Sequence, residues 1–175
     1  MSDPAPTDSS VELRRTGLDG HADALRELLT AHYLEADPQA QAYYDELDGI
    51  DIDGAVQDDL TRLQDPDPDR PLVVAVDNGG LVGSVELKRL GPSTAEVKRL
   101  YVVPPYRGHG IGRALIERLI HEARTEGFAT LRLGVAPFHE RARTLYRDIG
   151  FVDTDRYDAS GAPPVDDWGF MCYEL

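Results

Sequence analysis

The spacing of apolar and polar residues along the chain alternates between a helical period and a strand period. Leucines at helical spacing predict a helix over 21–34, and the apolar run LVVAV predicts a buried strand over 72–76. Two more strands are predicted over 81–90 and 95–103. The turn at 77–80 reads Asp-Asn-Gly-Gly, which favours a tight hairpin because Asn and Gly tolerate a positive φ angle.

The strongest helical pattern follows these strands, over 110–125, where one face is apolar and the other is charged. Its apolar positions are Ile111, Leu115, Ile116, Leu119, Ile120 and Ala123. The other predicted elements are a strand over 11–16, short helices over 41–47 and 55–63, a strand over 130–135, a helix over 140–149 and a last strand pair over 151–157 and 169–175. Because three hairpin-linked strands precede the long helix, we expect a mixed α/β domain and not a doubly wound one.

Composition is ordinary for a globular domain, with 175 residues of which 41% are hydrophobic and 29% charged. No apolar run is long enough to cross a membrane, so no membrane partner is expected. Residues 1–10 lack an export pattern and are predicted to be a disordered lead-in. Cys172 is the only cysteine, which fits a reducing compartment, so we expect a cytoplasmic protein with a single domain over 11–175.

Charge is distributed unevenly along this chain, whose formal net charge is −14. Residues 35–69 contain 12 acidic residues and one basic residue, whereas residues 98–113 contain four basic residues and no acidic one. A local cationic stretch in an anionic protein favours a phosphate-bearing ligand. Nucleic acid is not an expected partner, because a polyanion would be repelled by most of the surface.

The cationic stretch contains a glycine loop between a strand and the long helix. The sequence over 97–112 is VKRLYVVPPYRGHGIG, with Gly108, Gly110 and Gly112 at alternate positions. The two prolines cannot continue a strand ladder, so the strand must end before the loop. Glycines let backbone N–H groups converge, and the start of a helix binds phosphate through its unpaired N–H groups. A plain tight turn that caps the helix is the simpler alternative.

Two common phosphate-binding motifs do not fit this loop. A Walker A loop needs a Gly-Lys-Ser/Thr sequence, which is missing here. A Rossmann fingerprint that started at Gly108 would need a glycine where Arg113 stands, and one that started at Gly110 would need a glycine where Leu115 stands.

A third pattern fits. Arg107 to Gly112 is similar to the R/Q-x-x-G-x-G/A loop of the GNAT superfamily of N-acetyltransferases. The preceding VKRLYVVPPY resembles the central strand of that family, and LYRDIGF over 145–151 resembles its second signature helix with the strand that follows. The resemblance extends from about Leu72 to the C-terminus. It implies the GNAT fold, a mostly antiparallel central sheet flanked by helices with a splayed central strand.

The resemblance also implies residues that bind acetyl-CoA. In that family, N–H groups of the loop hold the pyrophosphate, and main-chain groups of the splayed strand hold the pantetheine arm. The positions so implied are Leu100, Tyr101, Val102, Arg107, Gly108, His109, Gly110, Ile111, Gly112, Arg113 and His139. His139 stands where the family commonly has an asparagine, which puts its role in doubt. No metal is implied.

Catalytic residues are implied in the same way. Tyr146 occupies the place of the family's frequent general acid, which protonates the leaving thiolate. Glu96 lies on the central strand, where the family often places a general base, and Glu86 on the adjacent strand is its rival. A tyrosine packed in the core and carboxylates in ion pairs are the alternatives. We expect His32 and the other helical histidines to be structural.

The function implied is direct transfer of an acetyl group from acetyl-CoA to a primary amine in a ternary complex. If the acidic stretch over 35–69 and the acids within 153–168 line the entrance, they would attract a small cationic amine. A CoA-binding regulatory module without turnover, or an acetyltransferase for protein N-termini or lysines, would be compatible with the same sequence. Dimers are common in the family, so a homodimer is expected.

Overall fold

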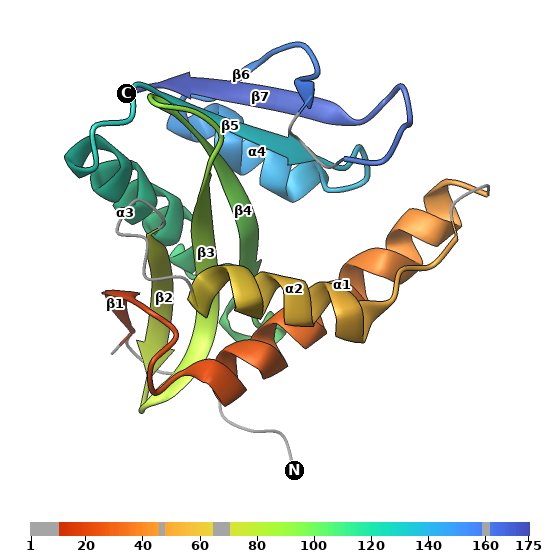
Figure 1. Cartoon of the computed structure of the whole chain (residues 1–175). Helices are drawn as coiled ribbons and strands as arrows, with labels where there is room; N and C mark the ends of the chain where they lie inside the picture. The colour runs from red at the N-terminus through yellow and green to blue at the C-terminus, as the bar shows by residue number, and fades with distance from the viewer. Residues whose placement is uncertain (1–10, 46–47, 65–70, 159–161) are drawn as a thin grey trace.

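The computed structural model describes residues 11–45, 48–64, 71–158 and 162–175, so the predicted lead-in over residues 1–10 lies outside the described part. In chain order the elements are β1 (Glu12–Thr16), α1 (Ala22–Tyr43), α2 (Ile52–Gln64), β2 (Leu72–Asp77), β3 (Gly80–Arg89), β4 (Thr94–Val102), the 3₁₀ helix η1 (Pro104–Tyr106), α3 (Ile111–Thr125), β5 (Thr130–Val135), α4 (Glu140–Ile149), β6 (Val152–Asp153) and β7 (Gly169–Glu174). Figure 1 shows helices on both sides of a twisted sheet.

The strands form one sheet in the order β1-β2-β3-β4-β5-β7-β6. Neighbouring strands are antiparallel except β4 and β5, which are parallel. The predicted hairpin between β2 and β3 is confirmed, because Asn78 has a φ of 47° and Gly79 a φ of 81°. The mixed, mostly antiparallel sheet expected from the sequence is therefore present.

Two apolar cores cover the two faces of the sheet. The predicted apolar face of α3 is buried against one face, together with Val73, Val97 and Leu131 of the strands. Helices α1 and α2 cover the other face through Leu25 and Val56, which pack against alternate residues of β2. Among the described residues, no helix has the length and apolar character needed to cross a membrane.

The sheet divides between β4 and β5, which pair only over Thr94–Glu96 and Thr130–Arg132 and then separate. Figure 1 shows β2 to β4 and β5 to β7 running in different directions beyond this fork. Strand β4 also carries a bulge, since Ser84 pairs with Tyr101 whereas Glu86 pairs with Lys98. Arg99 in the bulge has a φ of 55°, which is uncommon for a residue with a side chain. The expected splayed central strand is thus confirmed.

Two boundaries differ from the prediction. Helix α1 does not end near Leu34 but continues through Pro38 to Tyr43, and the helix expected over 41–47 is partly absorbed into it. The last two positions of that expected helix lie outside the described residues. The strand predicted over 151–157 is wrong beyond Asp153, because the chain there leaves the sheet edge and turns Tyr157 inward.

Candidate active site

The glycine loop leads directly into α3. Gly108 has a φ of 83°, and Gly110, which caps the helix, has a φ of 79°. Both angles favour glycine, and apart from the residues adjacent in the chain nothing lies within 4 Å of where a Cβ would stand at either position. The N–H of Ala114 bonds to the Gly110 carbonyl at 3.0 Å, whereas the N–H groups before it have no partner one turn back in the helix. The loop is therefore open, rich in donors and suited to an anion such as a diphosphate.

The arginines flanking the loop differ in their contacts. Arg107 donates to both oxygens of Glu35 on α1, at 2.8 and 2.7 Å, and its Nε donates to the Val102 carbonyl at 2.7 Å. These hydrogen bonds, followed by the charge of Arg107, hold the pKa of Glu35 below its usual value. Arg113 is half-exposed and lies 3.5 Å from Glu117. The donors that remain available in the loop are therefore mainly backbone N–H groups.

The predicted pantetheine-binding residues lie at the end of β4 beyond the fork. Leu100, Tyr101 and Val102 follow the bulge and sit past the last residue that pairs with β5. The Tyr101 ring is buried, lies 5.6 Å from the ring of His32, and its hydroxyl donates to Glu35 at 3.3 Å. This edge of β4 is therefore not paired with β5 at the residues whose main-chain groups are expected to bind the pantetheine arm.

Glu96 is the last residue of β4 that pairs with β5, and its side chain is buried. The Tyr157 hydroxyl donates to Oε1 at 2.7 Å. Oε2 has the Nζ of Lys98 at 3.4 Å, and no described residue gives it a hydrogen bond. Glu86, by contrast, is bound by Arg62 at 2.5 Å, and burial raises its pKa. Of the two candidate bases, Glu96 has the freer oxygen.

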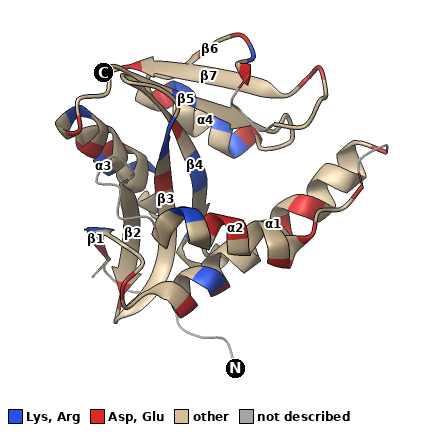
Figure 2. Ribbon diagram, in the orientation of Figure 1, with Lys and Arg blue, Asp and Glu red and all other residues tan. Residues whose placement is uncertain are grey.

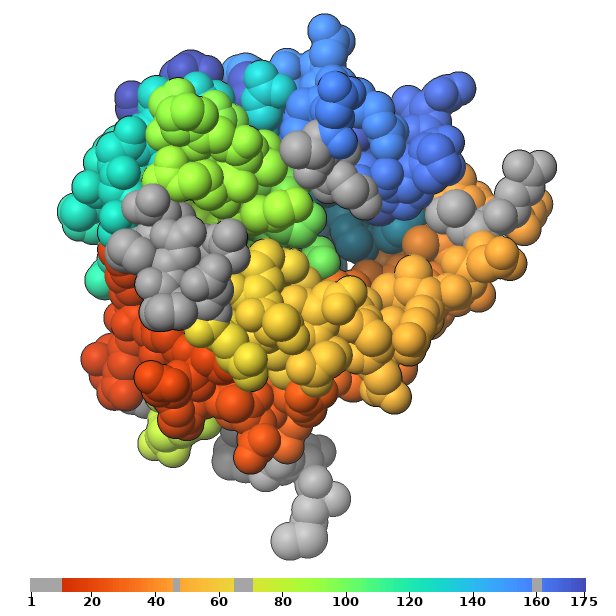
Figure 3. Space-filling model, in the orientation of Figure 1, coloured from red at the N-terminus to blue at the C-terminus, as the bar shows by residue number. Residues whose placement is uncertain are grey.

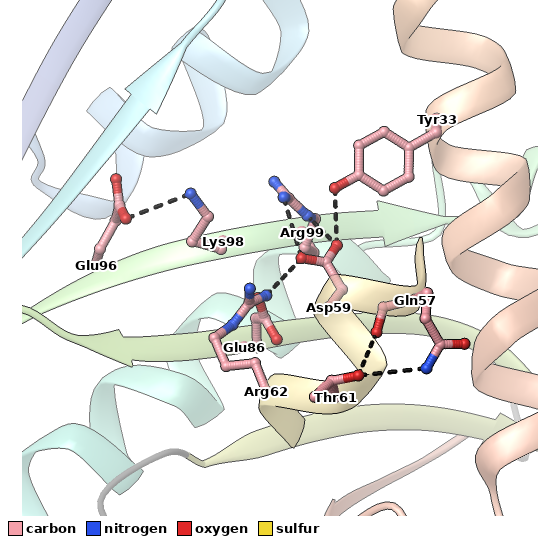
Figure 4. Close-up of polar contacts among 9 residues, drawn as sticks. All are labelled: Tyr33, Gln57, Asp59, Thr61, Arg62, Glu86, Glu96, Lys98 and Arg99. Atoms are coloured by element: carbon pink, nitrogen blue, oxygen red, sulfur yellow. Dashed lines mark hydrogen bonds and ion pairs between the residues drawn. The ribbon is translucent and has the colours of Figure 1, made fainter. Parts of the chain in front are cut away.

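A buried ionic network that the sequence analysis missed lies next to these carboxylates (Figure 4). Asp59 on α2 is only 1% exposed and accepts hydrogen bonds from Tyr33 at 2.8 Å, Arg62 at 2.6 Å and Arg99 at 2.6 Å. Burial alone would raise the pKa of Asp59, but the bonds and charges of the two arginines lower it. The sequence carried a signal for this residue, since it lies among the apolar positions of α2, next to the buried Leu60.

Tyr146 lies on α4 within the core on the α3 side of the sheet, where its ring is 5.6 Å from that of Phe151. Burial raises the pKa of the Tyr146 phenol well above its usual value, so the hydroxyl stays protonated at neutral pH. Glu96 belongs to the opposite face, since its neighbour Val97 packs into the α3-side core. The predicted acid and base thus lie on opposite faces of the sheet.

Two buried histidines of this region, His32 and His139, have lowered pKa values. Burial, with a smaller contribution from Arg99, lowers the pKa of His32 to about 4. Burial also lowers the pKa of His139, which precedes α4 and lies 4.7 Å from the ring of Phe138. His109 is exposed in the glycine loop. Within the described ranges, no group of three or more side chains could hold a metal ion.

The molecular surface is hollowed between the two halves of the sheet. Figure 3 shows this hollow bordered by yellow atoms of α2, orange atoms of α1, green atoms of the β3–β4 region and blue atoms of the connection from β6 to β7. Figure 2 shows acidic residues along α1 and α2, and basic residues on β4. Asp153 and Asp167 are not free at this entrance, because they bind Arg147 and Tyr44.

Comparison with known proteins identifies the family. Residues 22–151 match the sequence model of the Acetyltransferase (GNAT) family. The chain is a member of the GNAT family. It is 36% identical over 100 residues to an IAA acetyltransferase of Azospirillum brasilense, a match covering 56% of this chain and 65% of that relative. The match to an uncharacterized N-acetyltransferase of Mycobacterium bovis covers 54% of that relative. The chain therefore spans less than two thirds of the length of these curated relatives.

Solved structures share the fold of this GNAT chain over almost its whole length. An acetyltransferase from Streptococcus agalactiae has a TM-score of 0.70 at 24% identity, covering 96% of this chain and 100% of that one. A putative acetyltransferase from Salmonella typhimurium, solved with acetyl-CoA, has a TM-score of 0.69 at 24% identity, covering 95% of each chain. At such identities the likeness concerns the fold alone.

The GNAT fold brings some predicted residues together and separates others. The loop over 107–113 and the free edge formed by Leu100, Tyr101 and Val102 adjoin each other through Arg107. Glu96 and Glu86 share one face of the sheet with Lys98 and Arg99 (Figure 4). The cluster around Asp59, together with Tyr157, was not expected from the sequence, and the roles of all these residues remain predictions.

Proposed function

We propose that this GNAT protein transfers an acetyl group from acetyl-CoA directly to a primary amine in a ternary complex. One observation carries the proposal: the open glycine loop at the start of α3 follows the edge of β4 that β5 has left. A loop with free N–H groups suits the diphosphate of CoA, and the free edge suits its pantetheine arm. Acetyl-CoA supplies the activated thioester, and the protein supplies binding, orientation and proton transfer.

Glu96 is the proposed general base. A primary amine is protonated at neutral pH and must lose a proton before it attacks a thioester. Oε2 of Glu96 can accept that proton, because no described residue gives it a hydrogen bond, while Tyr157 fixes Oε1 at 2.7 Å. Glu86 is a weaker candidate, since Arg62 occupies its Oε1 at 2.5 Å.

Tyr146 is the proposed general acid. As the new C–N bond forms and the C–S bond breaks, the nitrogen gives its second proton to water, and the sulfur of CoA leaves as a thiolate. The phenol of Tyr146 donates a proton to this thiolate and is then reprotonated from water. The raised pKa of Tyr146, caused by burial, keeps that proton in place until the thiolate appears. The acid and the base act from opposite faces, and the fork between β4 and β5 joins the two faces.

Measurement of CoA thiol release tests the proposal. Purified full-length protein is given acetyl-CoA and a panel of small amines, polyamines and lysine-bearing peptides. We expect release of CoA thiol with at least one small amine, together with the acetylated amine as product. Binding of acetyl-CoA without turnover on any amine would indicate a CoA-binding regulatory module. Turnover confined to peptides would indicate a protein acetyltransferase.

A further inference from the structure

Two cations flank the carboxylate of Glu96 at the fork. Arg132 on β5 is in register with Glu96, and Lys98 follows two residues later on β4. Neighbouring residues in register, and residues two apart on one strand, share a face of the sheet. The residues next to Arg132, Leu131 and Leu133, pack into the α3-side core. Arg132 and Lys98 therefore project to the same side as Glu96.

These two cations have few anionic partners. The guanidinium of Arg132 lies 5.2 Å from the centre of the Tyr157 ring, its Nε is buried without a hydrogen bond, and no carboxylate of the described residues forms an ion pair with it. The Lys98 side chain is 15% exposed and has only Glu96, at 3.4 Å. Burial lowers the pKa of Lys98. Lys98 thus has one carboxylate partner and Arg132 has none among the described residues.

Arg132 differs from the two arginines of the neighbouring network around Asp59. The chain has 32 acidic residues against 18 lysines and arginines, and both Arg62 and Arg99 have carboxylates within 3 Å. Arg62 binds Asp59 and Glu86, and Arg99 binds Asp59. A partly buried arginine left without a carboxylate in such an acidic protein is costly unless another anion completes it.

The surroundings of Arg132 suit a small organic molecule. Tyr157, Trp168 and Phe170 come from the connection and strand that follow β6, and Tyr157 and Phe170 are in edge-to-face contact at 5.5 Å. The indole of Trp168 lies 3.1 Å from where a Cβ of Gly134 would stand, two residues after Arg132. Aromatic side chains thus adjoin Arg132, since its guanidinium lies 5.2 Å from the centre of the Tyr157 ring.

We infer that the acceptor amine also bears a carboxylate, as an amino acid does, and that Arg132 and Lys98 bind this carboxylate while the amine faces Oε2 of Glu96. The inference rests on the proposed function and names the class of its acceptor. An amino acid with an uncharged side chain is neutral overall and lysine is a cation, so the acidic residues on α1 and α2 repel neither. A simple polycation, in contrast, would meet two cations beside the base.

Matched pairs of amines test the inference, with CoA thiol release as the readout. One pair is L-phenylalanine and phenethylamine, and the other is L-lysine and cadaverine, where the second member of each pair lacks the carboxylate. A charge-assisted hydrogen-bond pair favours binding by roughly tenfold or more. We expect kcat/KM to be about tenfold higher for at least one amino acid than for its partner amine.

Variants show whether Arg132 is responsible. In Arg132→Gln we expect KM for the amino acid to rise about tenfold, with a smaller effect on kcat. KM for the matched amine should be nearly unchanged. Arg132→Lys should restore part of the difference in kcat/KM between the amino acid and its matched amine. Arg124→Gln, at an exposed position in the last turn of α3, is the control and should behave as the wild type.

The outcomes separate this inference from the proposed function. Two results would overturn the inference alone. One is a higher kcat/KM for the amines without a carboxylate, and the other is an equal loss of kcat/KM for both members of a pair in Arg132→Gln. Titration of L-phenylalanine and L-lysine into the CoA-bound protein gives a second readout. Binding that depends on Arg132 without any turnover would keep the inference and overturn the proposed function. If neither amino acid is bound or acetylated, the inference is wrong.

Discussion

Oδ2 of Asp59 accepts a hydrogen bond of 2.6 Å from Nε of Arg99, and this pair joins α2 to the bulge of β4. The backbone of Arg99 has a φ of 55°, a conformation that costs a residue with a side chain about 1 kcal/mol or more. Leu100, the first residue of the free edge, follows directly. The ionic network therefore holds the strand in the shape that the candidate site requires.

Replacement of Asp59 should weaken the whole fold. Asp59→Asn removes the negative charge that balances the buried positive charges of Arg99 and Arg62. We expect the free energy of unfolding, measured by urea denaturation at neutral pH, to fall by about 3 kcal/mol. Asp58→Asn, one residue earlier and exposed, is the matched control and should change it by less than about 0.5 kcal/mol. Equal effects at the two positions would refute the role given to the network.

The glycine loop can be tested with two glycines that share one backbone conformation. Gly110 at the start of α3 and Gly127 after its end both have a φ of 79° and free space around a Cβ. Glutamate at either position should cost similar backbone strain. Only Gly110→Glu places a negative charge at the proposed diphosphate site, so we expect calorimetry to show affinity for CoA falling about a hundredfold there and unchanged in Gly127→Glu. Equal CoA affinities of the two variants would show that the loop is not part of the CoA-binding site.

The role of Tyr146 can be tested against a second tyrosine. The rings of Tyr146 and Tyr173 both pack on Phe151, at 5.6 and 5.1 Å. Removal of the hydroxyl from Tyr146 should lower kcat by about a hundredfold with little change in CoA affinity, because the thiolate loses its acid. Tyr173→Phe should retain activity. An unchanged kcat in Tyr146→Phe at saturating substrate would exclude the phenol from the mechanism.

Stability should depend on pH through His32, whose pKa burial lowers from 6.5 to about 4. The folded state therefore resists protonation that the unfolded state accepts, so stability is complete above about pH 6.5 and decreases as the pH falls towards 4. Between about pH 7 and pH 5 we expect His32 to account for a loss of about 2 kcal/mol in the free energy of unfolding. The free energy of unfolding of His32→Gln should fall less over that interval. The variant His121→Gln, at an exposed position, should show the same change as the wild type. A pH dependence unaltered in His32→Gln would contradict this account.

Local signals in the sequence were sufficient for much of the fold. The apolar positions predicted for α3 are all buried, and the Asn78-Gly79 turn has the expected backbone angles. Such features depend on periodicity and turn chemistry within a few residues. The resemblance of the loop over 107–112 to the GNAT motif placed the chain in the family that its sequence match supports.

Features that depend on distant contacts could not be predicted. Helix α1 continues past Pro38 to Tyr43, whose ring lies 5.5 Å from that of Phe138, and Tyr44 bonds to Asp167; both partners lie far along the chain. The strand expected over 151–157 stops early, and Tyr157 reaches Glu96 instead. The partners of Asp59 lie on α1, α2 and β4, so only the assembled fold reveals them.

Acetyl transfer itself is tested most directly with acetyl-CoA that carries deuterium in its acetyl methyl group. The labelled compound is incubated with full-length protein and a free, unlabelled amine that the panel has shown to be an acceptor, and mass spectrometry follows the label. We predict that the label appears on the nitrogen of the amine, and that none is bound covalently to the protein when acetyl-CoA is added alone. Label found only in free acetate, or attached to the protein in the absence of amine, would contradict direct transfer.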